Sequence, residues 1–238
     1  MIQKHNFENP FPKLIQSIFQ TEYEFTDTLD NLHILFETNL IAQEEIEYHK
    51  QIHDWKNDRN SIFIKKFHKY VDTNPYFNET YIQFIQRYIR PLFPEETHLA
   101  IQKTPNIRFS LPNSVAIGRD PQDPINIVGL HSDSMFGHNE HEMNFIVPIT
   151  PMFSTNSIYY EPFIDSNIIP QEYENLILNP DEFMQVYFNK LKHCNKVNQT
   201  NKTRISFDMR VIPYSKYMEN HDFFKGTKFE LGKYYIVV

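Results

Sequence analysis

The sequence predicts a mainly β protein whose β-rich part is preceded and flanked by helices. Apolar residues recur at helical spacing before residue 100, whereas later apolar runs are short, β-branched and aromatic, with Pro, Asn and Asp between them. A chain of 238 residues with 40% hydrophobic content is long enough to bury a large core. We therefore expect a single domain over residues 1–238, with a helical layer over 1–100 packed on a β core over 101–238.

Three segments predict the helical layer. The strongest pattern covers residues 81–92, where apolar residues recur at i, i+3 and i+4 spacing and Pro91 and Pro94 close the segment. Residues 28–40 and 62–71 show weaker helical patterns, and clusters of Asn and Asp lie between them. We expect these helices to pack on the β core.

Short apolar segments separated by turn residues predict the β core. They span residues 107–111, 125–131, 143–149, 157–162, 183–193, 203–212 and 229–238. Such a succession of short strands after a helical layer favours a β-sandwich or a jelly roll. The chain has no internal repeat and only five glycines, which leaves little flexible spacer and favours one compact unit.

Composition limits the partners and the compartment. The net charge is −7 without long runs of one sign, so nucleic acid is a poor partner, because binding phosphates requires a basic face. No segment reaches the length of a membrane span, and the N-terminus lacks the apolar region of a secretory signal. The single cysteine, Cys194, fits a reducing compartment. We expect a cytoplasmic protein without a nucleic-acid or membrane partner; the oligomeric state stays open.

His131 and Asp133 form the first half of a candidate metal site. Residues two apart on a strand point to the same side, and His193 from a distant strand can complete a face of two histidines and one carboxylate. This face holds Fe(II) and leaves positions open for a co-substrate and oxygen. Taken alone, the His-x-Asp pair also fits an Asx-capped turn, and a lone His more often satisfies a hydrogen bond. His138 is an alternative third ligand in a zinc set, and His141 is a further rival.

The segment after His193 supplies a candidate anion-binding strand. Residues 203–212 alternate between apolar and polar side chains, and the polar set includes Arg204 and Ser206. An Arg one strand beyond a metal-binding His can bind the far carboxylate of a dicarboxylate co-substrate bidentately, and the Ser hydroxyl adds a donor. A solvated polar face on a half-buried strand is the alternative explanation.

These motifs together resemble the StrG-type family, which is named for streptomycin biosynthesis. The resemblance covers roughly the second half of the chain, over residues 105–217, and residues 1–95 show none. It is carried by residues 130–138, 142–150, 154–158, 193–198 and 203–213. The family consists of Fe(II)/2-oxoglutarate-dependent oxygenases with a double-stranded β-helix, also described as a jelly roll or cupin-like core.

The resemblance implies roles for individual residues. It implies that His131, Asp133 and His193 are the iron ligands and the catalytic residues, and that Arg204 anchors 2-oxoglutarate with Ser206 as a helper. Fe(II) is then the cofactor, and 2-oxoglutarate and O₂ are co-substrates. The segment over residues 118–123 before the metal strand looks longer than is usual in the family.

Five further polar residues are candidates for binding. Asn144 lies between apolar neighbours on a predicted strand, so it could bind co-substrate, support an iron ligand, or serve as a satisfied core amide. The tentative substrate-binding residues are Arg108, His138, Asn156 and Arg210.

The expected function is that of a non-haem Fe(II)/2-oxoglutarate-dependent dioxygenase that hydroxylates a small polar metabolite. A sugar, an aminocyclitol or an amino-acid derivative fits the acidic balance and the polar loop over residues 134–142. Three alternatives stay open: a redox-inactive cupin-type hydrolase or isomerase, a protein side-chain hydroxylase, and a non-catalytic sugar- or protein-binding module. The three ligands together with Arg204 argue against the last, because a binding module needs neither.

Overall fold

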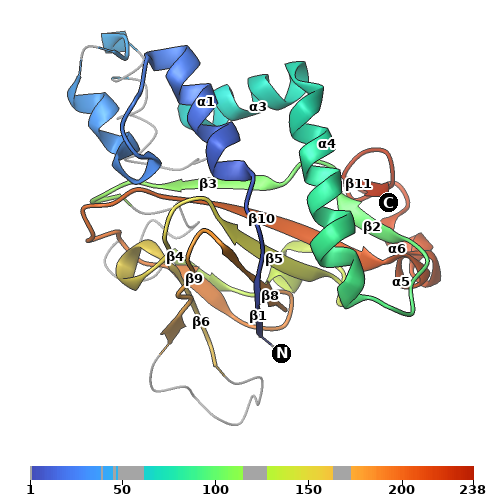
Figure 1. The fold of residues 1–238 in the computed structure, drawn as a ribbon. Coiled ribbons are helices and arrows are strands. Elements are labelled where there is room, and N and C mark those ends of the chain that lie inside the picture. The colour runs from blue at the N-terminus through green and yellow to red at the C-terminus, as the bar shows by residue number, and fades with distance from the viewer. Residues whose placement is uncertain (1, 39, 45–46, 48–61, 115–127, 163–172) are drawn as a thin grey trace.

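Two antiparallel β-sheets and a layer of helices make up the computed structural model (Figure 1). The structure describes residues 2–38, 40–44, 47, 62–114, 128–162 and 173–238. The large sheet contains β1 (Gln3–Asn6), β8 (Glu182–Val186), β5 (Met143–Pro148), β10 (Arg204–Pro213), β2 (Leu99–Gln102) and β11 (Tyr235–Val237) in this order, and β3 (Asn106–Ser110) also pairs with β10. The small sheet has the order β4 (Val128–His131), β9 (His193–Asn195), β6 (Ile158–Tyr160) and β7 (Glu174–Asn175).

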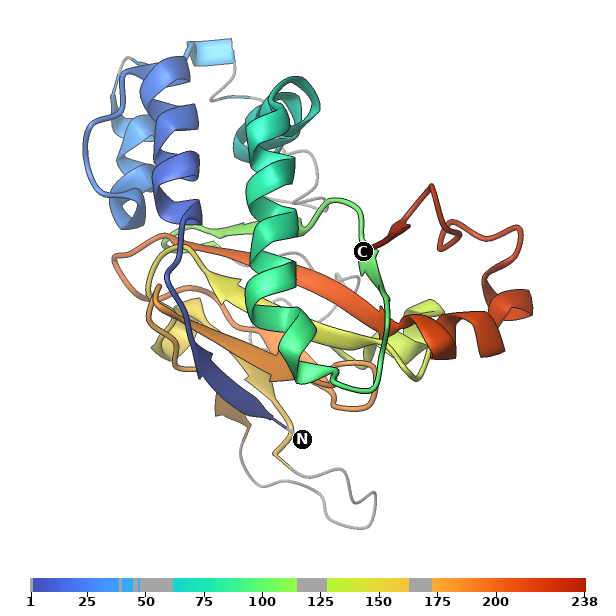
Figure 2. The same ribbon diagram turned by 45° about the vertical axis from the view of Figure 1, so that its right-hand side comes forward.

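Helices from the N-terminal part of the chain cover one face of the large sheet (Figures 1 and 2). They are α1 (Phe11–Tyr23), η1 (Leu29–Glu37), α3 (Ile62–Thr73) and α4 (Pro75–Phe84), which continues through η3 (Ile85–Ile89) and η4 (Arg90–Leu92). Two short helices, α5 (Tyr214–Glu219) and α6 (His221–Phe224), follow β10 at one end of the large sheet. In the parts of the chain that the structure describes, no helix is long and apolar enough to cross a membrane.

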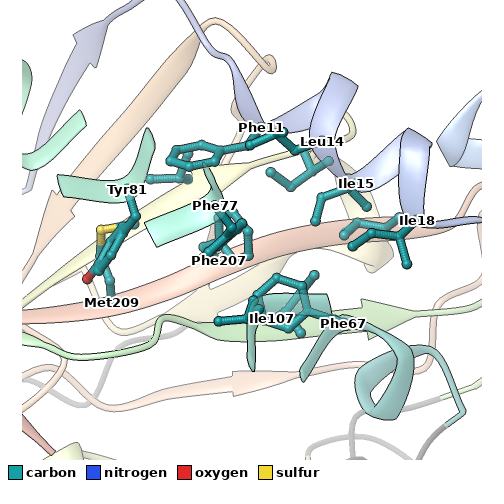
Figure 3. Packing of buried hydrophobic residues seen from close by; sticks show 14 of the residues in the cluster. Phe11, Leu14, Ile15, Ile18, Phe67, Phe77, Tyr81, Ile107, Phe207 and Met209 are labelled. Carbon is teal, nitrogen blue, oxygen red and sulfur yellow. The ribbon is translucent and has the colours of Figure 1, made fainter. Parts of the chain in front are cut away.

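The alternation along β10 explains how the helical layer attaches. Its apolar side chains are fully buried, and Phe207 contacts Phe11, Phe67 and Phe77 with ring centroids 5.2, 5.6 and 5.9 Å apart (Figure 3). Aromatic rings at such distances stabilise a core beyond the area that they bury. Because side chains alternate along a strand, the polar set of β10 must face away from the helices.

The predicted helical segments form with changed limits. The run that was predicted over 81–92 begins already at Pro75, because Asn74 caps it: its Oδ1 accepts from the backbone N–H of Tyr76 at 3.0 Å. The pattern predicted over 62–71 is helical and extends to Thr73, whereas the weak pattern after residue 28 forms the tighter helix η1. Sequence patterns missed α1, and they missed that β1 and β2 from the first hundred residues pair within the large sheet.

Two strand predictions are wrong in extent. Residues 183–193 form two strands in different sheets, because the chain turns between them: the N–H groups of Lys190 and Leu191 donate to the carbonyl of Tyr187. Residues 229–238 are extended only over β11, since Gly232 has a positive φ of 82° and turns the chain before it. The first residues of the predicted strand 125–131, up to 127, lie outside the described residues.

Candidate metal centre

His131, Asp133 and His193 meet at one end of the small sheet. His131 ends β4, His193 begins β9, and the two are direct partners in the antiparallel pairing of these strands. Asp133 is the first residue of the short helix η5 (Asp133–Phe136), two positions beyond the strand end. Strand pairing therefore brings together two histidines that are 62 positions apart in the sequence.

The three side chains are close enough to bind one ion. One ligand atom from each lies within 4.8 Å of the others, and the Nε2 atom of His193 is 3.7 Å from Oδ1 of Asp133. The two imidazole rings have centroids 4.4 Å apart. Two imidazoles and one carboxylate are the donor set of non-haem Fe(II) centres, so the residues present fit such an ion.

The surroundings of His193 keep its ring neutral and fix its orientation. Nδ1 lies 3.2 Å from the carbonyl oxygen of Leu191, which can only accept, so Nδ1 carries the hydrogen and Nε2 faces Asp133 with its lone pair. The ring stacks on Phe188 at 4.0 Å. Burial lowers the pKa of His193 to about 4, although the neighbouring Asp133 opposes this shift. At neutral pH the ring is therefore in the form that binds metals.

Asp133 is held as a carboxylate by charged and polar partners. Oδ2 accepts from Nη2 of Arg210 at 2.8 Å and from Nδ2 of Asn144 at 2.9 Å, which leaves Oδ1 on the side of His193. Burial alone would raise the pKa of Asp133, but Arg210 and His193 hold this pKa below its usual range. The carboxylate is thus charged and fixed in orientation at neutral pH.

The candidate co-substrate residues lie on the polar face of β10. Arg204 is buried, and its Nη2 donates to Oδ1 of Asn195, which lies two residues beyond His193 on β9, at 3.3 Å. Ser206 is also buried and is paired with Arg108 on β3, so these two residues share a face of the sheet. The structure thus places Arg204 against the strand that carries His193, as the spacing predicts.

The other candidate residues differ in how closely they approach the metal centre. Asn144 donates to Asp133 and to Oδ1 of Asp208 at 3.2 Å, which favours support of a ligand over direct binding. Asn156 is buried, and it accepts from the N–H of Phe153 at 2.8 Å, which indicates that it stabilises its loop. Arg108 is half-buried.

His138 and Arg210 are engaged in a buried network rather than directed outward. Nδ1 of His138 lies 2.8 Å from Oε1 of Glu142, and its side chain is 10% exposed. Arg210 contacts Asp133, Glu142 and Asp208. The carboxylates around the guanidinium argue against the tentative substrate role of Arg210, whereas the role of His138 stays a prediction.

Sequence reasoning assigned no role to Phe136 and left the role of Glu142 open. Glu142 is fully buried, and its position four residues after His138 was the available signal. Phe136 lies against the ring of His131, with centroids 4.9 Å apart, and remains 39% exposed. Its neighbour Met135 is 67% exposed. The loop that looked polar in the sequence therefore presents apolar surface beside the candidate metal ligand His131.

A known protein is similar to this chain in sequence. No protein-family model matches the chain. In sequence, the chain is 29% identical over 185 residues to the streptomycin biosynthesis protein StrG of Streptomyces griseus. The aligned region covers 77% of this chain and 79% of StrG. This similarity confirms the resemblance to the StrG-type family that the motifs indicate. A match over 185 residues is longer than the segment 105–217 and must include part of residues 1–95, so the expectation that residues 1–95 show no resemblance is wrong.

Three solved structures align with part of the chain at low sequence identity and with TM-scores below 0.5. The nickel complex of the non-heme monooxygenase ThoJ has a TM-score of 0.41 at 12% identity, covering 84% of this chain and 77% of ThoJ. HygX from Streptomyces hygroscopicus with nickel and 2-oxoglutarate bound has a TM-score of 0.38 at 10% identity, covering 73% of this chain and 87% of HygX. The non-heme alpha ketoglutarate dependent epimerase SnoN from nogalamycin biosynthesis has a TM-score of 0.36 at 10% identity, with coverages of 72% and 74%.

Proposed function

We propose that the protein is a non-haem Fe(II)/2-oxoglutarate-dependent oxygenase in which His131, Asp133 and His193 hold the iron. The observation that carries this proposal is the convergence of their ligand atoms within 4.8 Å of one another. The similarity to StrG supports the family resemblance that implies this class. A redox-inactive metal enzyme would use the three ligands but would not need Arg204 and Ser206 on the facing strand.

The strand order supports a double-stranded β-helix as the core. From β3 to β10, strands β3, β5, β8 and β10 lie in the large sheet, and strands β4, β6, β7 and β9 lie in the small sheet. The chain thus passes repeatedly between two antiparallel sheets, as it does in a jelly roll. We include this core in the proposal.

Different residues would bind 2-oxoglutarate and orient the iron ligand Asp133. Bound iron, with 2-oxoglutarate and O₂, supplies the oxidising chemistry, while the protein supplies binding and orientation. Arg204 is placed to pair with the distal carboxylate of 2-oxoglutarate, and Ser206 adds a hydroxyl donor. Asn144 and Arg210 orient Asp133. Both His193 and Asp133 are buried, which limits the access of water to this side of the site.

The substrate in this proposal is a small polar molecule, such as a sugar, an aminocyclitol or an amino-acid derivative. Arg108 shares the polar face of the large sheet and offers a charged group. The exposed ring of Phe136 beside His131 offers an apolar surface for the face of a ring-shaped substrate. The single cysteine fits a reducing compartment, and we include the cytoplasm in the proposal.

Release of succinate tests the proposed class. Protein loaded with Fe(II) under anaerobic conditions is mixed with 2-oxoglutarate, and succinate is measured after O₂ is added, with and without pooled metabolites, peptides and oligonucleotides. We expect succinate release that requires both 2-oxoglutarate and O₂ and that rises with a metabolite pool. No succinate under any condition would favour a redox-inactive enzyme, and a rise only with peptides would favour a side-chain hydroxylase.

Replacing Phe136 with Ala is expected to weaken substrate binding while metal binding is retained. Loss of one aromatic contact of about 0.5–1.5 kcal/mol corresponds to a KM that is roughly 2- to 10-fold higher. The KM for the substrate found in the screen and the Kd for Ni(II) are measured. Phe223→Ala is the matched control, because Phe223 is 46% exposed and lies on α6. An unchanged KM in the Phe136 variant would remove Phe136 from the substrate site.

A further inference from the structure

Arg210 lies between the candidate metal carboxylate and a second buried carboxylate. Its Nη2 atom is 2.8 Å from Oδ2 of Asp133, and its Nε atom is 2.9 Å from Oε1 of Glu142. Asp208 approaches from the same strand, with Oδ2 at 3.4 Å from Nη2. Arg210 is 6% exposed and Glu142 is 0% exposed, so water does not substitute for these contacts. The guanidinium therefore joins two carboxylates in fixed geometry.

The far carboxylate is itself held by two groups. Nδ1 of His138 lies 2.8 Å from Oε1 of Glu142, and the hydroxyl of Tyr235 donates to Oε2. Tyr235 is fully buried on β11, in the last strand of the chain. The neighbouring Tyr234 accepts from Nη1 of Arg210 at 3.3 Å. The C-terminal strand thus reaches the metal centre through Glu142 and Arg210.

The contacts of Arg210 select one oxygen of Asp133. Arg210 and Asn144 both donate to Oδ2, whereas Oδ1 faces Nε2 of His193. A carboxylate whose Oδ2 is occupied offers the metal only Oδ1. Binding through both oxygens would occupy a further coordination position, and too few positions would stay open for a chelating co-substrate together with O₂.

We infer that Arg210 is a positioning residue that holds Oδ2 of Asp133 and thereby enforces metal binding through Oδ1 alone, with Glu142 and Tyr235 keeping Arg210 in place. This inference rests on the proposed function, because it requires Asp133 to be a metal ligand. It assigns Arg210 and the C-terminal strand to the metal centre rather than to substrate recognition. The positive charge also offsets part of the negative charge of the three carboxylates around it.

Binding of Co(II) tests this role, because its visible absorption reports the coordination number independently of turnover. Arg210→Met removes the guanidinium and its contacts to Asp133 and Glu142. Arg210→Lys retains the positive charge but not the forked guanidinium. Tyr235→Phe removes only the hydroxyl that donates to Glu142. We expect Arg210→Met to weaken Co(II) binding roughly 10- to 100-fold, as for other partners of metal ligands, and to change the absorption spectrum. Arg210→Lys is expected to retain part of the Co(II) affinity that Arg210→Met loses. Tyr235→Phe is expected to change the Co(II) affinity and the spectrum in the same direction as Arg210→Met, but slightly.

The controls separate this inference from the proposed function. Arg87→Met removes an arginine with a side chain that is 70% exposed on η3, and it should leave both readouts unchanged. Near-ultraviolet circular dichroism shows whether each variant is folded; if Arg210→Met does not fold, Arg210→Lys and Tyr235→Phe decide the question. Wild-type affinity and spectrum in the folded variants would overturn the role of Arg210 and leave the proposed function intact. Absence of Co(II) binding by the wild-type protein would contradict both.

Discussion

Replacing Asp133 with Ala is expected to abolish high-affinity metal binding and all turnover while the fold is retained. The change removes the only carboxylate of the three-residue site and leaves two histidines. Loss of a residue that hydrogen-bonds to a metal ligand lowers metal affinity roughly 10- to 100-fold, so loss of the ligand itself should lower it further. The fold should persist, because Arg210 keeps Glu142 and Asp208 as partners. Isothermal titration with Ni(II) measures the affinity, and circular dichroism measures the fold.

A histidine from the same loop provides the control for Asp133→Ala. His141 was a rival ligand in the sequence, and its half-buried side chain lies 3.9 Å from Glu140, outside the three-residue site. His141→Ala should therefore bind Ni(II) as the wild-type protein does. Full Ni(II) occupancy in Asp133→Ala would show that the metal is held elsewhere. Loss of Ni(II) binding in His141→Ala, or ligation by His138 in place of His193, would show the same.

The alternation along β10 shows how far a sequence can predict a site. Ile205 and Phe207 on one side and Arg204 and Ser206 on the other were separated correctly, because period 2 is a property of the strand itself. The sequence also predicted that the polar set faces inward beside a metal-binding His. That inference depended on a combination of motifs, since an exposed polar face would produce the same alternation.

Contacts between distant segments were beyond the reach of pattern reasoning. His131 and His193 are partners because β4 pairs with β9, and no periodicity in either strand specifies its neighbour. Arg210 lies on the same polar face as Arg204, so both were candidates for binding an anion. The buried carboxylates around Arg210, among them Glu142, identify it as an arginine that the protein itself holds, and the sequence alone does not show them.

Short or edge elements were missed for a related reason. β1 has the polar sequence Gln-Lys-His-Asn and forms a strand because it pairs with β8, not because of its own pattern. The segment over 183–193 has the composition of one strand, yet a turn at Tyr187 divides it between the two sheets. In both cases tertiary pairing overrides local propensity.

The helical layer also takes part in placing the candidate co-substrate anchor. The N–H of Thr203 donates to the carbonyl of Asp30 at 2.7 Å, and the Thr203 hydroxyl lies 2.9 Å from Nδ1 of His33. Lys202 forms an ion pair with Asp30 at 2.9 Å. These contacts from η1 fix the residues that directly precede Arg204. The N-terminal region, which shows no motif in the sequence, thus supports the strand on which the proposed chemistry depends.

Replacing Arg204 with Met is expected to abolish tight binding of 2-oxoglutarate and to leave metal binding intact. Arg204 is 1% exposed, so an anion that reaches it is paired with little competition from water. Removing one partner of a buried ion pair typically costs about 3–5 kcal/mol, which is more than roughly a hundredfold in Kd. The Kd for 2-oxoglutarate is measured by titration of the Ni(II)-loaded protein, and the Kd for Ni(II) is measured separately.

Graded variants on the same strand separate this role from a general disturbance of β10. Ser206→Ala removes one hydroxyl donor and should weaken 2-oxoglutarate binding by only about 0.5–1.5 kcal/mol. Arg204→Lys retains a charge but loses the bidentate fork, so its Kd should lie between those of the wild-type protein and Arg204→Met. The prediction is wrong if Arg204→Met binds 2-oxoglutarate normally. It is also wrong if the variant loses Ni(II) together with 2-oxoglutarate, since Arg204 would then support the fold of the metal centre rather than the anion.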